Sequence, residues 1–98
     1  MKNTERQKLL RAKKDAYNFY IKEIAEAYND ILERKRDILA VAREIRNGKG
    51  QGNEFKKIRI TYIKETVDLI KTLRQRIDVL VDTVVITKTI IKELSDEK

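Results

Sequence analysis

With 98 residues the chain is long enough for one domain, whose core is modest because a protein of this size hides only about two thirds of its unfolded surface. Hydrophobic residues make up 41% and charged residues 40%, with no proline and three glycines, a composition that favours long helices and excludes a disordered chain. The lack of cysteine and histidine, with Ser95 as the single serine, excludes thiol, histidine and serine catalytic centres, and the net charge of +7 favours polyanionic partners.

The first predicted element is a helix of about residues 5–47. Apolar side chains recur there every seven positions, the spacing of one helical stripe. The series is Leu10, Tyr17, Ile24, Ile31, Ile38 and Ile45, with Tyr20, Ala27 and Val41 at intermediate steps. Thr4 and Gln7 have the spacing of a capping box, which predicts that the helix begins beside them.

A turn is predicted over residues 48–53, because all three glycines of the chain fall there. We expect Asn47 or Gly48 to end the first helix in a left-handed conformation and Asn53 to cap the second helix. A nucleotide-binding loop is disfavoured, since that motif needs a preceding strand and a Lys-Ser/Thr pair, whereas Asn53 and Glu54 open the helix here.

A second helix is predicted over about residues 54–94. Its seven-residue series is Ile63, Ile70, Ile77, Val84 and Ile91, with Leu73, Leu80 and Leu94 at companion positions. β-Branched residues crowd the segment 79–91, and by themselves they favour a strand. The seven-residue period continues through them without a break, so it predicts a helix.

Together the two series predict an all-α fold in which residues 1–98 form a single domain, a long, antiparallel, coiled-coil-like hairpin of two helices. If the chain reverses about Gly50, the two stripes come into register. The facing pairs are then Ile38 with Ile63, Ile31 with Ile70, Ile24 with Ile77, Tyr17 with Val84 and Leu10 with Ile91, and the residue numbers of each pair add up to 101.

Further apolar side chains lie off the stripe, more than one pair of helices can cover. They predict an interface either with a second copy, giving a homodimeric four-helix bundle, or with a larger protein. The predicted interface residues are Ile21, Tyr28, Leu32, Leu39, Ile60, Val67, Val85, Ile86 and Ile90.

Basic residues concentrate in the segment 33–59, which folds to the turn end of the hairpin. This basic tip predicts contact with the phosphate backbone of DNA or RNA, without reading of bases. The predicted nucleic-acid-binding residues are Arg34, Lys35, Arg36, Arg43, Arg46, Lys49, Lys56, Lys57 and Arg59, against Glu33, Asp37, Glu44 and Glu54. Tyr62, beside the tip, is the tyrosine placed to contact a base. Residues 1–14 are also basic but approach the acidic residues of the C-terminal segment.

The leading hypothesis is therefore a basic, non-enzymatic accessory or adaptor protein that binds a protein partner and nucleic acid. The alternative is a purely protein-binding helical module whose charge is incidental. The segment Ile31–Ala42, with residues 17–24 before it, resembles part of the helical domain of the GINS replication proteins over less than a third of the chain, which points toward a DNA replication or processing complex.

No cofactor, metal or small-molecule substrate is expected. Glu23, Glu26 and Asp30 fall at helical spacing but are interpreted as a solvated face, since no histidine accompanies them. No apolar run approaches the roughly 20 residues that span a bilayer, and the first residues run into charge rather than into the core of a signal peptide. We therefore expect a cytoplasmic protein without a membrane span.

Overall fold

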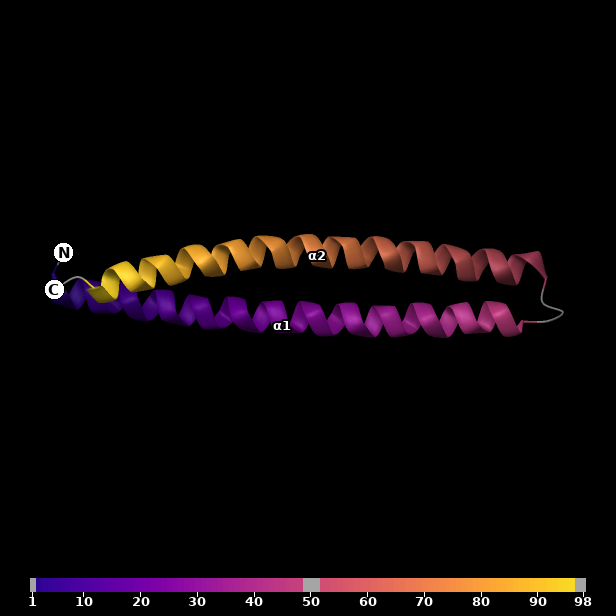
Figure 1. Ribbon diagram of the computed structural model, residues 1–98, viewed down its shortest axis with the longest axis horizontal. Coiled ribbons are helices and arrows are strands. Elements are labelled where there is room, and N and C mark those ends of the chain that lie inside the picture. The colour runs from indigo at the N-terminus through magenta and orange to yellow at the C-terminus, as the bar shows by residue number, and fades with distance from the viewer. Residues whose placement is uncertain (1, 49–51, 97–98) are drawn as a thin grey trace.

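The computed structural model describes residues 2–48 and 52–96, and within them it consists of two helices lying side by side (Figure 1). Helix α1 spans Asn3–Asn47 and helix α2 spans Asn53–Asp96. The first turn of α1 and the last turn of α2 lie at the same end, so the helices are antiparallel. The hairpin is a rod of 74 × 15 × 14 Å. The predicted two-helix, all-α fold is confirmed, including the helix through the β-branched segment 79–91.

The helix ends differ from the predictions. Thr4 and Gln7 do not form a capping box, because α1 already begins at Asn3 and Lys2 precedes it without any side-chain hydrogen bond. The carbonyl of Lys2 accepts the first helical hydrogen bond, from the backbone N–H of Arg6 at 2.9 Å. Asn53 lies inside α2 rather than before it, and the carbonyl of Gly52 accepts from the N–H of Lys56 at 3.5 Å.

The end of α1 also differs from the expected left-handed cap. Gly48 has φ −81° and ψ 51°, which is not left-handed backbone, and its N–H donates to the carbonyl of Ile45 at 3.4 Å. Asn47 is the last helical residue of α1. Asn53, the last residue of the predicted turn of residues 48–53, thus belongs to α2. The proposed fold point, Gly50, lies outside the described residues.

The two helices pack through a continuous seam with a seven-residue period. When positions are labelled a to g with Ile31 and Ile70 at a, the residues at a and d of both helices are buried or half-buried, except Asn3 and Lys56 at the helix starts. The central cluster is formed by Ala27, Ile31, Ile70 and Ile77, against which Ile24, Ile38 and Leu73 pack. The core therefore lies near the middle of the rod.

Two ion pairs that cross between the helices agree with the predicted register. The guanidinium of Arg76 contacts the carboxylate of Glu23 at 2.5 Å, and Nε of Arg59 lies 2.8 Å from the carboxylate of Glu44. The residue numbers of the first pair add up to 99 and those of the second pair to 103, on either side of the predicted total of 101. The central cluster contains Ile31, Ile70 and Ile77, and Ile24 packs against it, in agreement with that register.

The seam also contains polar side chains. Thr66 and Thr87 occupy d positions of α2, with 5% and 6% of their surface exposed. Each hydroxyl is satisfied inside its own helix, because Thr66 donates to the carbonyl of Tyr62 at 2.8 Å and Thr87 to that of Thr83 at 2.7 Å. These buried threonines were not among the predicted core residues.

We expect Ile77→Ala to lower the free energy of unfolding by about 2–4 kcal/mol, since it removes three carbons from a side chain that is 4% exposed. Ile86→Ala, the same change on the same helix at a side chain that is 61% exposed, should cost less than about 0.5 kcal/mol. Urea denaturation of dilute protein, followed by circular dichroism, measures both. Equal losses would contradict the assignment of the seam.

Thr87→Val should raise the free energy of unfolding by about 0.5–1 kcal/mol, because a methyl group replaces a hydroxyl at a buried seam position. The matched control is Thr89→Val, since Thr89 donates the same kind of bond, to the carbonyl of Val85 at 3.0 Å, but is exposed. The control should show no gain. A larger gain at Thr89 than at Thr87 in the same denaturation assay would argue against burial of Thr87.

Candidate nucleic-acid and partner interfaces

Outside the seam, helical geometry divides the surface into two broad faces and two outer edges. Positions e and b flank a on one side of each helix, positions g and c flank d on the other, and f points away from the partner helix. Glu23 and Arg76 are both at g and contact each other. The g positions of the two helices therefore share one face, and the e positions share the opposite face.

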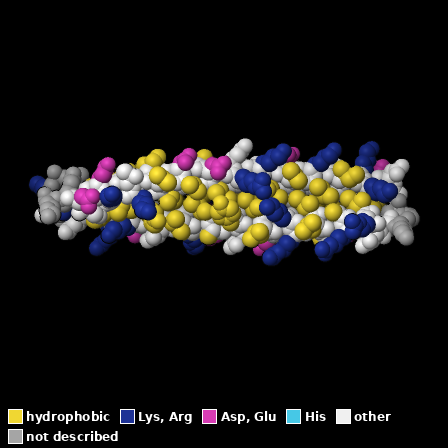
Figure 2. Space-filling view, in the orientation of Figure 1, with side chains coloured by type: hydrophobic (Ala, Val, Ile, Leu, Met, Phe, Trp, Pro, Cys, Tyr) yellow, Lys and Arg dark blue, Asp and Glu magenta, His cyan; other side chains and the backbone are white. Residues whose placement is uncertain are grey.

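The face of the e and b positions is strongly basic, and we call it the basic face. Its charged side chains, all exposed, are Arg11, Lys14, Lys35, Arg46, Lys57, Lys64, Lys71, Arg74, Lys88 and Lys92, against Asp78 as the one carboxylate of these positions within the described helices. Figure 2 looks onto this face, because α1 runs from left to right below α2 there and right-handed winding turns e and b toward the viewer. Lys and Arg side chains interrupt and border a band of apolar side chains.

The face of the g and c positions has the opposite charge, and we call it the acidic face. Its carboxylates are Glu5, Glu23, Glu26, Asp30, Glu33, Asp37 and Glu44 on α1 and Glu65 and Glu93 on α2. Arg76 is the one cation at these positions within the described helices, and it is paired with Glu23. The net charge of +7 thus conceals two oppositely charged faces.

Both faces also carry large apolar side chains that the hairpin leaves exposed. On the basic face these are Ile21, Tyr28, Leu32, Leu39, Ile60, Val67, Val81 and Val85, and on the acidic face they are Leu9, Phe19, Ile58, Tyr62, Leu69, Val79 and Ile86. None of the exposed large apolar side chains of the described residues is at an f position of an outer edge.

The predicted interface residues are divided between these faces. Seven of them, from Ile21 to Val85, belong to the basic face, whereas Ile86 belongs to the acidic face. Ile90 is half-buried at a g position of the acidic face. Sequence reasoning missed Phe19, Ile58 and Val79, although their spacing along the acidic face carries the same signal.

The structure separates the predicted nucleic-acid-binding residues into two kinds. Arg34 and Arg59 are half-buried at d positions of the seam. Nε of Arg34 donates to Asp30 at 3.3 Å, and the guanidinium of Arg59 lies 4.7 Å from the centre of the Phe55 ring. Nε of Arg59 is close to Glu44 but is not aligned for a hydrogen bond, so the contact is an ion pair alone. Of these two arginines, Arg59 pairs across the hairpin with Glu44, whereas Arg34 pairs within α1.

The other predicted cations are exposed, apart from Lys49, which lies outside the described residues. Arg36 and Arg43 are on the outer edge of α1, whereas Lys35, Arg46 and Lys57 belong to the basic face. Lys56 is the exposed a position in the first turn of α2. None of these six has a carboxylate of the described residues within 4.0 Å. They remain available to an external anion.

Tyr62, the predicted base-contacting tyrosine, lies on the acidic face. It lines a shallow hollow of α2 with Ile58 and Glu65 among its other residues. A carboxylate beside the ring is unfavourable for an approaching phosphate backbone. The same hollow is lined by Lys57, one of the exposed cations, and by Glu54, so Tyr62 has both a tip cation and carboxylates among its neighbours.

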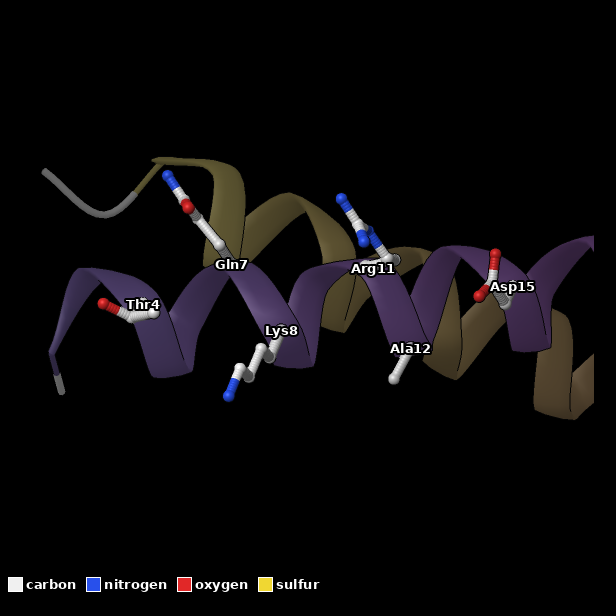
Figure 3. A pocket seen from close by; sticks show the side chains of 6 residues that line it. All are labelled: Thr4, Gln7, Lys8, Arg11, Ala12 and Asp15. Carbon is white, nitrogen blue, oxygen red and sulfur yellow. The ribbon is translucent and has the colours of Figure 1, made fainter.

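The hollows of the described surface are shallow and open. The one in Figure 3 is lined by residues of α1 alone, namely Thr4, Gln7, Lys8, Arg11, Ala12 and Asp15. Gln7 and Arg11 extend to one side of the helix, and Lys8 and Ala12 to the other, so these side chains do not converge on a point. Within the described residues there is no group of three or more carboxylates placed to hold a metal ion.

Neither described helix has a stretch that is both long and apolar enough to cross a membrane. Comparison of the chain with models of protein families, with curated proteins and with solved structures finds no match. The arrangement of its own side chains is therefore the basis for assigning a function.

Charge reversal at Arg59 should destabilise the hairpin, whereas reversal at Arg43 should not. Arg59→Glu places two carboxylates together beside Glu44, and we expect a loss of about 1 kcal/mol in the free energy of unfolding, since both side chains are partly exposed. Arg43→Glu should change it by less than about 0.5 kcal/mol. Adding Glu44→Arg to Arg59→Glu should restore most of the loss in urea denaturation. Failure of this rescue would show that the ion pair does not contribute.

Proposed function

We propose that this protein is a non-enzymatic helical adaptor that binds protein through its apolar faces and contacts the phosphate backbone of nucleic acid through the exposed cations at its turn end. The nucleic-acid contact is inferred from the six exposed cations in that part of the rod, none of which has a carboxylate of the described residues within 4.0 Å. An intracellular setting fits such a partner, and the proposal needs no cofactor.

Phosphate contact needs mobile cations that are not already neutralised, because each phosphate that is neutralised releases counterions. Arg36 and Arg43 are two turns apart on the outer edge of α1, which places them about 10 Å from each other along the rod. No acidic residue occupies the f positions between or beside them, as the neighbouring f residues are Lys22 and Asn29. The f positions of this edge therefore present cations to a phosphate backbone, and the nearest carboxylates, Glu33, Asp37 and Glu44, belong to the adjoining acidic face.

The lack of an enclosed pocket among the described residues agrees with a binding protein rather than an enzyme. Small-molecule sites are concave and converge a few polar groups on the ligand, whereas the hollows described above are open and shallow. A rod with two flat faces instead offers area, which is what macromolecular partners use.

A purely protein-binding module remains the second candidate function, and the exposed apolar side chains of both faces favour it. The two functions differ in their response to salt. Phosphate binding weakens steeply as salt rises, whereas apolar packing between helices changes little.

Fluorescence anisotropy with labelled single- and double-stranded DNA and RNA at about 50 and 200 mM salt tests the proposal. Arg36→Glu combined with Arg43→Glu should weaken binding at least about tenfold. It should also reduce the slope of the logarithm of the binding constant against the logarithm of salt concentration by about 2 in magnitude. The matched control is Lys8→Glu combined with Lys22→Glu, which makes the same charge change at f positions of α1 far from the turn.

The control should bind much like the unaltered protein. Equal weakening by both double variants would mean that net charge, not the turn end, attracts the nucleic acid. Absence of binding to all four probes at low salt would reject nucleic-acid contact and leave the protein-binding module.

A further inference from the structure

Each broad face of the hairpin is itself divided lengthwise. On the basic face, α2 carries the cations Lys57, Lys64, Lys71, Arg74, Lys88 and Lys92, whereas α1 carries the bulkier apolar side chains Ile21, Tyr28, Leu32 and Leu39. On the acidic face the division is reversed, because seven of the nine carboxylates are on α1 and most exposed apolar side chains are on α2. The division of the basic face is partial, because α1 also carries Arg11, Lys14, Lys35 and Arg46, and α2 also carries Ile60, Val67, Val81 and Val85.

We infer that a second copy of this chain covers each face, with the basic face of one copy packed on the acidic face of the next. The inference rests on the protein-binding part of the proposed function and names the partner. It does not involve Arg36 and Arg43, which lie on the outer edge of α1 and stay exposed between stacked copies.

A half-turn about the stacking direction matches the rows of the two faces. It lays α1 of one copy over α2 of the next, so that the helix with seven of the nine carboxylates of the acidic face meets the helix with six of the ten cations of the basic face. The same rotation lays the apolar row of α2, which includes Ile58 and Val79, over the apolar row of α1 in the neighbouring copy. The more acidic helix of one face then meets the helix with more cations on the other, and the more apolar helix of the acidic face covers the helix with the bulkier apolar side chains of the basic face.

Stacking of unlike faces also explains why both faces are apolar. A two-fold pair would join identical faces, which opposes the ten cations of one basic face to ten others, or the carboxylates of one acidic face to their copies. It would also leave the second face of each copy uncovered. A head-to-tail contact uses one interface to cover both faces of every internal copy.

The area of a face is sufficient for a stable contact. A face of 74 by 15 Å has a footprint on the order of 1,000 Å², compared with about 800 Å² per partner in a standard protein interface. The charges add specificity and orientation, whereas the apolar rows supply most of the affinity.

Sedimentation velocity at about 50 mM salt measures the association directly. The unaltered protein should sediment as concentration-dependent species heavier than its 11.6 kDa chain. One variant reverses the basic row through Lys64→Glu, Lys71→Glu and Arg74→Glu, and the other reverses the acidic row through Glu26→Lys, Glu33→Lys and Asp37→Lys. Each variant alone should associate at least about tenfold more weakly, because like charges then face each other.

An equimolar mixture of the two reversed variants should regain the association, since each supplies the face that the other has lost. The matched control is Glu54→Lys with Asp68→Lys and Asp82→Lys, three reversals on the outer edge of α2, and it should associate like the unaltered protein. Circular dichroism reports whether each variant keeps its helices. Should a reversal reduce helicity, neutral changes to Gln or Asn at the same positions provide the same comparison, with a smaller expected loss of association.

The results decide between stacking and other partners. An unaltered protein that stays at 11.6 kDa up to high concentration overturns the inference, and so does a reversed variant that associates by itself as strongly as the unaltered chain. A mixture that fails to recover overturns it as well. Anisotropy with nucleic acid uses Arg36 and Arg43 instead, so a failure of stacking is distinct from a failure of nucleic-acid contact.

Discussion

A pair of helices can bury only one stripe of each helix, and the remaining properties of this protein follow from that constraint. Among the described residues the buried apolar side chains are five, Ala27, Ile31, Ile70, Ile77 and Leu94, and they lie along a single seam. Every additional large apolar side chain must remain half-buried or reach the surface. The chain nevertheless places its exposed apolar residues on the two faces that flank the seam, where packing by another molecule can cover them.

The seam specifies register more than it supplies stability. The seam is not apolar along its whole length, because its d positions include Arg34, Arg59, Thr66 and Thr87. The threonines satisfy their hydroxyls within α2, and the arginines reach carboxylates at the rim of the seam. Slipping one helix by a turn would separate Glu23 from Arg76 and Glu44 from Arg59 together, so both partly exposed pairs favour the observed alignment even though each is individually weak.

The proposed function separates two tasks on different parts of one rod. The broad faces combine apolar area with charge of one sign each, which suits protein contacts of defined orientation. The outer edge of α1 near the turn combines Arg36 and Arg43 with no apolar neighbour at f, which suits a solvated polyanion.

The sequence by itself determined the helices, their seven-residue period and their antiparallel register, because periodic burial is local information and one glycine-rich segment allows one reversal. It misjudged the helix ends at Thr4, Gly48 and Asn53, where backbone hydrogen bonds rather than capping side chains decide the boundary. It grouped the tip cations by their position in the chain. Only the tertiary structure showed that Arg34 and Arg59 belong to the seam, and that the other charges divide into a basic and an acidic face, because that division depends on which sides of the two helices meet.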